Sequence, residues 1–524
     1  MKRIVMSLIV VLNIFSICAT QKVKLIPYPN YLVEQGGEFM FKNELTVNMP
    51  TTADNEFKYF TQVLANENFV KVSKAKRANI LFKKVNNMGK EAYELYIGKE
   101  GIKVLYTHNS GCFYAIQTLR QLMRLKGDGS YVIPACVIKD RPNYAWRSFM
   151  LDESRHFKGK AFVKQMLDQL AYIKMNVFHW HLVDDQGWRI QIKKYPKLTD
   201  VGAWRDSTQI ARVPKGTTPK FYSYAHGGFY TQDDIKEIVA YAAERHITVV
   251  PEIEMPGHAC AAIAAYPWLS CTNEEIRVNC QFGIFKPTYN VADERVFTFF
   301  QDVLETVMAL FPSKIIHIGG DEVKYDQWLA DDAVKALMKE KNFKTPSDLH
   351  VYFVNRISKF IVSKGYKTMG WNDILGKNVH EWAEAETVQE KLSSNTIVHF
   401  WKGQPELLVD AIKQGYSVVN SNHWDTYLDY TYKVIPLEKS YNFSPLPKNM
   451  PVEYKKNVLG FGCQMWSEYI PKVTDAYRQI FPRIAAYAEV GWTNDDLKDF
   501  NRFSSNLIEL KRYWDSKGVV YWDN

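Results

Sequence analysis

The stretch His317-Ile318-Gly319-Gly320-Asp321-Glu322 follows the apolar pair Ile315-Ile316, which predicts a short buried strand. The two glycines allow the backbone to turn tightly where this strand ends, and two adjacent carboxylates follow. Adjacent acids repel each other and resist burial, so we expect one of them to keep its proton near neutral pH. A protonated carboxyl group beside an ionised one is suited to cleaving a glycosidic bond. The alternative is a solvated acidic turn, the usual place for charged side chains.

On both sides of this stretch, strand-like runs alternate with amphipathic helical runs. The strand-like runs are Arg147–Leu151, Asn176–Leu182, Thr248–Ile253, Lys314–Ile318, Lys367–Trp371, Thr396–Trp401, Ser417–Ser421 and Val458–Trp466. The helical runs are Ala161–Lys174, Gln232–Arg245, Glu294–Leu310, Pro346–Lys364, Glu406–Gln414 and Asp475–Glu489. Eight repeats over about 350 residues predict an α/β fold, a (β/α)8 barrel of the TIM type, which we place at residues 142–494.

A smaller α/β (α+β) accessory domain is predicted before the barrel, at residues 21–141. Its expected elements are β-type runs at Phe39–Val47, Asn79–Phe82, Ala92–Ile97, Ile102–Tyr106 and Tyr131–Ile138, and a helix at Ser110–Met123. This part of the chain has no acid pair and no histidine cluster, so we expect it to support the barrel rather than to react. Residues 495–524 are expected to form a helical tail that is too small to be a domain.

Residues 1–20 have the pattern of a secretory signal peptide. Lys2-Arg3 form a basic start, residues 4–17 are largely apolar, and small residues follow. We therefore expect export, with the protein periplasmic or secreted. Lipid anchoring at the cell surface through Cys18 is an alternative that the bulky Ile17 disfavours. No later segment is apolar enough to predict a membrane span.

Length and composition narrow the class of protein. A chain of 524 residues exceeds one ordinary core and favours two domains. Hydrophobic residues at 46% and charged residues at 23% are typical of a globular protein. The net charge of +9 is spread among acids without a basic run, which argues against a nucleic-acid partner. Six cysteines follow Cys18 without a C-x-x-C motif, and we favour buried thiols over a Cys271–Cys280 disulfide, which export would permit.

Polar or aromatic side chains follow the strand-like runs of the predicted barrel. In such barrels the chemistry takes place at the C-terminal ends of the strands. In chain order these positions hold Asp152 and Arg155; His179, His181, Asp184 and Asp185; Glu252, Glu254 and His258; Asp321 and Glu322; Trp371; Trp401; Tyr427 and Asp429; and Trp466 and Glu468. Arranged around one axis, they predict a pocket with acids on its floor and tryptophan walls.

These residues lie in motifs that resemble those of the glycoside hydrolase family 20 β-N-acetylhexosaminidases. His317–Glu322 matches the family pattern H-x-G-G-D-E, Leu151–Phe157 matches L-D-x-S-R-H, and His179–Asp185 matches H-W-H-L-x-D-D. Pro256–His258, Tyr427–Asp429 and Trp466–Glu468 also correspond. The resemblance covers almost the whole chain after residue 20 and implies a TIM barrel preceded by an accessory domain. It implies no metal and no cofactor.

The resemblance implies an exo-acting enzyme that hydrolyses terminal, non-reducing β-linked GlcNAc or GalNAc with retention, through an oxazolinium intermediate. Glu322 would be the general acid and later the general base. Asp321 would accept the acetamido N–H and steady the developing positive charge. Tyr427 would donate a hydrogen bond to the acetamido carbonyl oxygen, which is the nucleophile. The family is an exception to the two-carboxylate scheme, and neighbouring residues could hardly take the opposed positions which that scheme needs.

The same resemblance implies roles for the remaining site residues. The walls that pack the acetamide methyl group and the sugar face would be Trp371, Trp401 and Trp466. The ligands of the sugar hydroxyls would be Arg155, Asp429 and Glu468. Asp184 and His258 would form a supporting pair that tunes the proton of Glu322. We favour structural roles for Asp152, His179 and Trp180, and for Glu254 both kinds of role stay open.

Three other functions stay open on the residues alone. A metal-dependent hydrolase on the same barrel would use as zinc ligands His179, His181, Asp184, His258 and Asp321. A non-catalytic sugar-binding protein would keep the pocket without turnover. A family member with a neighbouring specificity would be endo-acting or would release lacto-N-biose. The sequence does not decide between GlcNAc and GalNAc, nor does it give the linkage, the natural glycan or the oligomeric state.

Overall fold

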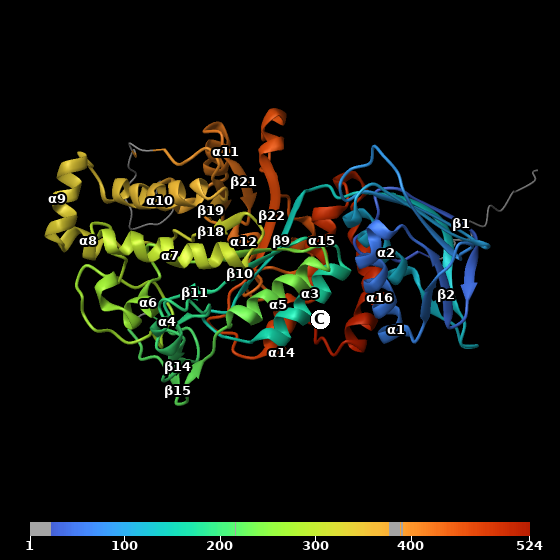
Figure 1. Ribbon diagram of the computed structural model, residues 1–524, viewed down its shortest axis with the longest axis horizontal. Helices are drawn as coiled ribbons and strands as arrows, with labels where there is room; N and C mark the ends of the chain where they lie inside the picture. Colours follow the sequence, from blue (N-terminus) through green and yellow to red (C-terminus); the bar gives the residue numbers. More distant parts are fainter. Residues whose placement is uncertain (1–22, 215, 377–387, 389–390, 524) are drawn as a thin grey trace, which may run out of the picture.

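The computed structural model describes residues 23–214, 216–376, 388 and 391–523 (Figure 1). The predicted signal peptide, with Cys18, lies outside the described residues. Figure 1 shows a sheet domain at one end of an elongated molecule and a barrel with its helices beside it. Within the described part of the chain, the structure has no helix long and apolar enough to span a lipid bilayer.

The N-terminal domain is built on an eight-stranded mixed sheet in the order β1-β8-β5-β6-β4-β2-β3, with β7 beside β8. Its elements are β1 (Leu32–Phe41), β2 (Glu44–Asn48), α1 (Asp54–Asn68), β3 (Lys71–Lys74), β4 (Ile80–Lys84), β5 (Tyr93–Gly98), β6 (Gly101–Tyr106), α2 (Asn109–Leu122), β7 (Arg124–Leu125) and β8 (Tyr131–Asp140). The prediction of one strand over Phe39–Val47 is wrong, because the chain bends at Asn43 and divides that run between β1 and β2. The helix α1 and the strand β3 were not predicted.

Eight parallel strands close into a barrel in the order β9-β10-β17-β18-β19-β20-β21-β22. Their bounds are β9 (Trp146–Asp152), β10 (Val177–His181), β17 (Thr248–Glu252), β18 (Ile315–His317), β19 (Lys367–Trp371), β20 (Ile397–Phe400), β21 (Ser417–Asn420) and β22 (Val458–Met465). Each strand overlaps one predicted run, so the predicted (β/α)8 fold is confirmed.

The longer helices after the barrel strands are α3 (Lys160–Tyr172), α5 (Gln232–Ala243), α7 (Glu294–Leu310), α10 (Pro346–Ser363), α11 (Pro405–Lys413), α14 (Val473–Ile480) and α15 (Arg483–Trp492). The prediction of one helix over Asp475–Glu489 is wrong, because Pro482 has no N–H to donate and separates α14 from α15. The loops carry the helix α9 (Asp332–Lys341) and a set of shorter elements: β11 (Val183–Asp184), β12 (Gly187–Trp188), α4 (Lys197–Asp200), β13 (Trp204–Arg205), β14 (Thr208–Gln209), β15 (Phe221–Tyr222), β16 (His226–Gly227), α6 (Cys260–Ala265), α8 (Asp326–Ala330), α12 (His423–Thr426) and α13 (Leu437–Asn442).

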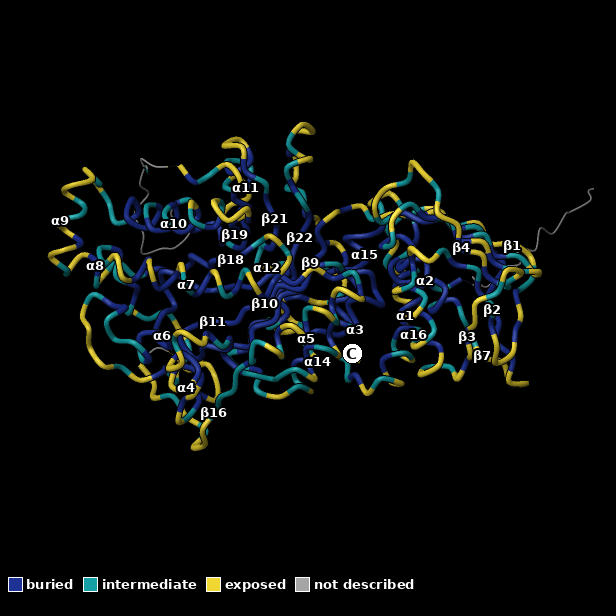
Figure 2. The backbone as a smooth tube through the Cα atoms, in the orientation of Figure 1, coloured by how far each residue is buried: buried dark blue, intermediate teal, exposed yellow. Residues whose placement is uncertain are grey.

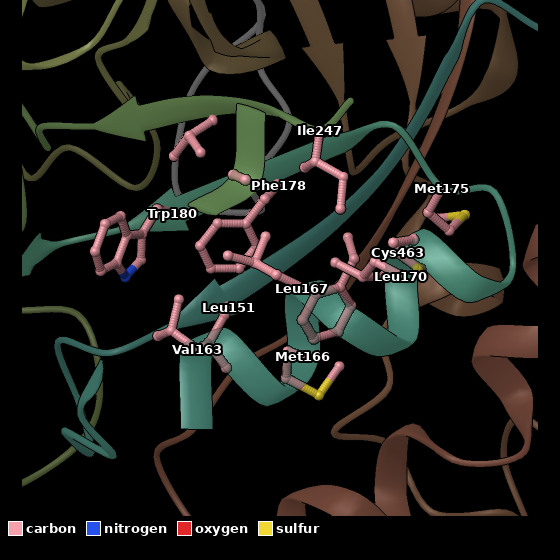
Figure 3. Close-up of a cluster of buried hydrophobic side chains, with 14 of the residues drawn as sticks. Leu151, Val163, Met166, Leu167, Leu170, Met175, Phe178, Trp180, Ile247 and Cys463 are labelled. Carbon is pink, nitrogen blue, oxygen red and sulfur yellow. The ribbon is translucent and has the colours of Figure 1, made fainter. Parts of the chain in front are cut away.

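Helix α3 illustrates how the outer helices cover the barrel. Val163, Leu167 and Leu170 recur at helical spacing and are buried. Figure 3 shows these side chains beside Leu151 of β9 and Phe178 of β10, in the layer between helix and barrel. Full burial of each such side chain stabilises the fold by about 1.5–3 kcal/mol.

The barrel interior is filled in layers, because alternate residues of each strand point inward. The lower layer is apolar and consists of Trp146, Val177, Val250, Met369, Ile397 and Val419. Two residues further along the strands the chain places a buried polar layer, made of Ser148, His179, Glu252, His317, His399 and Ser421, with Trp371 at the same level. Barrel interiors are usually filled by branched apolar side chains. The polar layer lies directly below the strand ends where the predicted site residues are found.

The C-terminal helix α16 (Phe500–Ser516) packs where the two domains meet. Tyr513 of α16 stacks on Tyr172 at the end of α3, with ring centroids 3.8 Å apart. The Asn506 side chain donates a hydrogen bond to the Leu25 carbonyl oxygen at 3.2 Å. Figure 1 shows α16 beside α1 and α2, and Figure 2 shows that the barrel centre is buried while the loops are exposed.

Asp140, at the end of β8, joins the sheet domain to the barrel. Its Oδ2 accepts hydrogen bonds from the Tyr93 hydroxyl at 2.6 Å and the Trp492 indole N–H at 2.9 Å. The buried ammonium of Lys174 lies 3.2 Å from the same oxygen. A buried cation that loses its counter-charge is strongly destabilising. Asp140 therefore fixes the last helix of the barrel and the start of β10 against the sheet.

We predict that Asp140→Asn lowers the free energy of unfolding by about 3–5 kcal/mol, because Lys174 is left buried without its counter-charge. Denaturant unfolding measures the loss. As a control, Lys71→Ala breaks an exposed pair with Glu44 at 3.6 Å and is expected to cost less than about 1 kcal/mol. Equal losses in the two variants would contradict the role of Asp140.

Candidate active site

The acidic pair Asp321-Glu322 follows β18 through a turn of unusual backbone geometry. Gly319 and Gly320 have φ values of +66° and +94°, and a Cβ on Gly319 would lie 1.9 Å from the carboxylate oxygens of Glu254. The absence of a side chain lets Glu254 approach the turn, where its Oε1 accepts a hydrogen bond from the Gly320 N–H at 2.8 Å. Glu322 has a φ of +55°, a strained value for a non-glycine residue. Such strain is concentrated at functional sites.

Asp373, in the short turn after β19, fixes the backbone of Glu322. Its Oδ1 accepts a hydrogen bond from the Glu322 N–H at 3.3 Å, and its Oδ2 accepts one from the Trp401 indole N–H at 2.8 Å. One carboxylate therefore sets the position of the acid relative to a tryptophan of the pocket. Sequence reasoning did not single out Asp373, although a carboxylate two residues after the strand-end Trp371 was a signal for it.

Two buried carboxyl groups, those of Asp321 and Glu254, share the floor of the pocket. Burial raises the pKa of Asp321 to about 8, although His258 acts in the opposite direction. Burial and the charge of Asp321 raise the pKa of Glu254 well above its ordinary value. The Nε2 of His258 is 3.9 Å from Asp321 Oδ2, and a positive charge at this distance favours the anion of Asp321. Glu254 is thus a third carboxyl group, beside the predicted acidic pair, whose raised pKa favours a bound proton near neutral pH.

His258 links the acidic pair to the carboxylates that follow β10. Its Nδ1 is 2.9 Å from Asp185 Oδ2 and 3.3 Å from Asp184 Oδ1, and its Nε2 is 3.6 Å from Glu322 Oε2. Burial alone would lower the pKa of His258, but these carboxylates raise it well above its ordinary value. The imidazolium therefore faces Glu322 with one nitrogen and two aspartates with the other. Sequence reasoning named Asp184 as the partner, and the structure adds Asp185 at the shorter distance.

Further charged side chains surround Asp184 on the side of the barrel interior. The guanidinium of Arg155 lies 2.6 Å from Asp184 Oδ2, and His181 Nε2 lies 2.9 Å from the same oxygen. Burial would raise the pKa of Asp184, but Arg155 and His258 outweigh it and hold that pKa below its ordinary value. Asp184 is therefore an anion among three cationic side chains, Arg155, His181 and His258.

Aromatic rings form the walls above these charges. Trp371, Trp401, Tyr427 and Trp466 are buried in one cluster with Met150. Tyr427 is parallel to Trp401 at 6.2 Å between ring centroids and lies 6.0 Å from Trp466. Aromatic faces of this kind suit the C–H faces of a sugar ring.

Asp429 and Glu468 complete the set of carboxyl groups at the strand ends. Burial and the charge of Glu468 raise the pKa of Asp429 to about 8. Burial also raises the pKa of Glu468, and Arg155 opposes the rise. The charge of the exposed Arg212 opposes the rise of both pKa values. Its guanidinium lies 5.4 Å from the ring centroid of Tyr469, which follows Glu468. Arg212 belongs to a loop between short strands, so no strand-end pattern pointed to it.

The structure brings together the predicted site residues at one end of the barrel, through the contacts described above. The three residues for which structural roles were favoured are fully buried. Trp180 packs against Tyr230 at 4.6 Å between ring centroids, and Asp152 accepts backbone hydrogen bonds from Ser154, Arg155 and Ser467. His179 faces the barrel interior beside Glu252.

The ligand set of the alternative metal hydrolase is not assembled in one place. Among the described residues, groups whose ligand atoms lie within 4.8 Å of one another place His179 with His317 and His399, but His181 with Glu252 and Glu254. Asp184 belongs to a group with Asp185 and His258, and Asp321 to one with His258 and Glu322. The six described cysteines are all free thiols, so in this part of the chain Cys271 and Cys280 form no disulfide.

A (β/α)8 barrel with buried carboxyl groups and aromatic walls at its C-terminal end defines a glycosidase-type site. Comparison with family models makes the class specific. Residues 144–495 match the family described as "Glycosyl hydrolase family 20, catalytic domain", and residues 22–141 match "Glycosyl hydrolase family 20, domain 2". The chain belongs to glycoside hydrolase family 20.

Individual relatives agree with this assignment. A β-hexosaminidase of Porphyromonas gingivalis is 32% identical over 95% of this chain, which spans 64% of that relative's length. A β-hexosaminidase of Vibrio furnissii is 34% identical over 89% of this chain and 76% of its own. The crystal structure of an exo-β-N-acetylglucosaminidase from Vibrio harveyi in complex with N-acetylglucosamine has a TM-score of 0.85 at 30% identity, and covers 96% of this chain and 79% of its own.

We predict that Gly319→Ala reduces activity at least tenfold and destabilises the fold, because the new methyl group would meet the Glu254 carboxylate and displace the turn that carries Asp321 and Glu322. Steady-state kinetics and thermal unfolding measure the two effects.

Gly518→Ala is a matched control, because Gly518 has the same φ of +66° but nothing lies within 4 Å of its Cβ position. The backbone strain alone costs about 1–2 kcal/mol and is common to both variants. Full activity of Gly319→Ala would show that Glu254 does not need its close approach.

Proposed function

We propose that the protein is an exo-acting β-N-acetylhexosaminidase that removes terminal β-linked GlcNAc or GalNAc by substrate-assisted, retaining hydrolysis. The observation that carries the proposal is the position of Asp321 and Glu322. They are consecutive residues, and both approach the same nitrogen of His258, at 3.9 and 3.6 Å. Two such carboxyl groups reach a bound sugar from one side, whereas an enzymic nucleophile has to face the acid across the bond. The nucleophile is therefore assigned to the substrate.

In the first step Glu322 donates a proton to the glycosidic oxygen while the acetamido carbonyl oxygen attacks the anomeric carbon. The bond to the leaving group breaks, and a cyclic oxazolinium ion forms. Asp321, whose anion the neighbouring His258 favours, accepts the acetamido N–H and stabilises the positive charge that develops on the ring. Tyr427 donates its hydroxyl proton to a hydrogen bond with the carbonyl oxygen.

In the second step Glu322, now ionised, takes a proton from water, and the oxygen of that water attacks the anomeric carbon. The oxazolinium ring opens, the acetamido group is restored, and two inversions give net retention. Trp371, Trp401 and Trp466 pack the acetamide methyl group and the sugar face. Arg155, Asp429 and Glu468 bind the sugar hydroxyls, while Asp184 and His258 tune the proton affinity of Glu322.

The substrate class follows from the same geometry. A pocket that closes around an acetamido group favours N-acetylhexosamines at the non-reducing end of an oligosaccharide or glycoconjugate. The printed description of the Vibrio harveyi relative, an exo-β-N-acetylglucosaminidase in complex with N-acetylglucosamine, supports this choice. The pattern of residues 1–20 supports export, to the periplasm or out of the cell.

We predict that Glu322→Gln lowers kcat on an aryl N-acetylglucosaminide by roughly 10²–10⁴-fold, the usual contribution of a general acid–base group. The control is Glu340→Gln, the same change at a side chain that is 68% exposed, and it should leave kcat unchanged. Unchanged turnover by Glu322→Gln would favour a sugar-binding protein or a different acid.

We predict that nitrophenyl glucosides, which lack the 2-acetamido group, are cleaved far more slowly than nitrophenyl N-acetylhexosaminides, because they lack the nucleophile. A thiazoline analogue of the oxazoline should inhibit strongly, since it resembles the intermediate. A panel of nitrophenyl glycosides with digests of chitobiose and an N-glycan tests both statements. Equal rates on glucoside and N-acetylglucosaminide contradict the mechanism, and release of a disaccharide contradicts the exo-acting assignment.

A further inference from the structure

Glu252, at the end of β17, contacts side chains of three other barrel strands in the polar layer below the pocket. It is fully buried. Its Oε1 accepts a hydrogen bond from the Trp371 indole N–H at 2.8 Å, and its Oε2 is hydrogen bonded to His181 Nδ1 at 2.6 Å. Two more imidazoles approach it, with His179 Nε2 at 2.9 Å and His317 Nδ1 at 3.0 Å. One carboxylate thus joins β10, β18 and β19 in the middle of the barrel.

The histidines around Glu252 differ in their pKa values. Burial alone would raise its pKa, but His317, His181 and His179 outweigh burial and hold it well below its ordinary value. Burial would lower the pKa of His181, but Glu252 and Asp184 raise it to about 10. Burial lowers the pKa of His179 to about 4. Glu252 is therefore an anion, and the imidazolium of His181 lies between it and Asp184.

Other charged groups also act on this centre. Glu254 and Asp321, above it, are carboxyl groups whose pKa values the charge of Glu252 raises. Burial holds the pKa of His399, which stacks on Trp371 at 4.2 Å, well below its ordinary value, so that ring is neutral. None of these groups can replace His181 as the bridge to Asp184, because His181 Nε2 alone among them lies 2.9 Å from Asp184 Oδ2.

The contacts form a continuous path to the reacting groups. Glu252 holds Nδ1 of His181, whose Nε2 holds Asp184, and Asp184 contacts His258, which faces Glu322. In the other direction Glu252 holds the indole of Trp371, which forms a wall of the pocket. The same carboxylate is therefore connected to the proton donor and to the surface against which the sugar packs.

We propose that Glu252 is a positioning residue, which keeps His181 as an imidazolium and Trp371 in place so that Asp184 and His258 align Glu322 with a sugar held by the wall. The proposal rests on the proposed function, because it assigns a role toward the same acid. Removal of the Glu252 charge should change catalysis through His181, whereas replacement of a purely structural residue would change only stability. No new group is required, and no proton passes through Glu252 during turnover.

The test is Glu252→Gln, which keeps the size of the side chain and removes its charge. The amide oxygen can still accept from the Trp371 indole, so the KM should change less than about threefold. The kcat should fall about tenfold to a hundredfold, because a small displacement of reacting groups has such effects. The pKa of His181 should fall with the loss of its anion. Its imidazolium, which in the wild type persists until the pH rises through about 10, should then be lost at lower pH, and the alkaline limb of the kcat–pH profile should move to lower pH by about one unit or more.

The matched control is Ser148→Ala, a buried change in the same layer of the barrel at a residue that contacts Trp146 and Phe461. The proposal predicts that Ser148→Ala leaves the pH profile unchanged, even where it lowers the melting temperature as much as Glu252→Gln does. If Glu252→Gln does not fold, His181→Gln tests the same path, since it removes the imidazolium and leaves the hydrogen bond between Glu252 and Trp371. It should lower kcat by a similar factor at every pH, because no imidazolium can form at that position, and an unchanged kcat would overturn the proposal.

A readout without substrate separates this proposal from the proposed function. The ¹⁵N chemical shifts of the His181 ring should show a doubly protonated imidazolium at pH 8 in the wild type and a neutral ring in Glu252→Gln. An unchanged His181 signal, together with a pH profile that matches that of Ser148→Ala, would overturn the positioning role. If the His181 ring shifts change as predicted but the wild-type protein is inactive on every N-acetylhexosaminide, the proposed function is overturned and the Glu252–His181 pair still stands.

Discussion

The structure depends on how charge is balanced at the C-terminal end of the barrel. Carboxyl groups gather there in larger number than cations, in surroundings from which water is largely excluded. An isolated buried anion is too costly, so each must be paired with a cation, hydrogen bonded or neutralised by a proton. Asp184 is paired with Arg155, His181 and His258, and burial with the charge of Asp321 raises the pKa of Glu254, so that a proton neutralises Glu254. The proposed chemistry needs one anion, Asp321, beside one proton donor, Glu322.

The barrel supplies this arrangement through the two-residue period of its strands. On β10 and β17 the inward positions run from Val177 and Val250, through His179 and Glu252, to residues at the mouth of the pocket. The apolar lower layer stabilises the fold, while the polar middle layer holds the upper one in register. Rigid strands suit this task better than loops, because catalytic groups must be held to within a fraction of an ångström. The N-terminal sheet and α16 contribute by fixing the outside of the barrel near Asp140 and Tyr172.

Much of this could be predicted from the sequence, since strand ends and the residues after them form a regular pattern. The eight barrel strands were found because each is an apolar run between turn residues, and the acidic pair was found because two glycines mark its turn. The division of Phe39–Val47 was missed, since a bend at Asn43 leaves the β-type composition unchanged on both sides. The break at Pro482 was missed because the apolar period continues through it.

Residues of the site that act across the barrel were harder to find. Asp373 was not singled out, and Glu252 was placed at a strand end without a role. Their importance lies in partners that are more than 25 residues away along the chain, such as Trp401 for Asp373 and Trp371 for Glu252. Arg212 reaches the site from a loop with no periodic pattern. Contacts between distant segments depend on how the barrel closes. A local sequence pattern predicts that a barrel forms, but not which side chains meet across it.

The most direct test of the central claim is a crystal structure of the enzyme with a thiazoline analogue of the oxazoline bound. We predict the ring of the analogue between Trp371, Trp401 and Trp466, with its nitrogen roughly 3 Å from an Asp321 oxygen and with the Glu322 carboxyl group on the side of the leaving group. A Glu322 side chain turned away from the tryptophan walls, or a metal ion seated among His258, Asp321 and Glu322, would contradict the account.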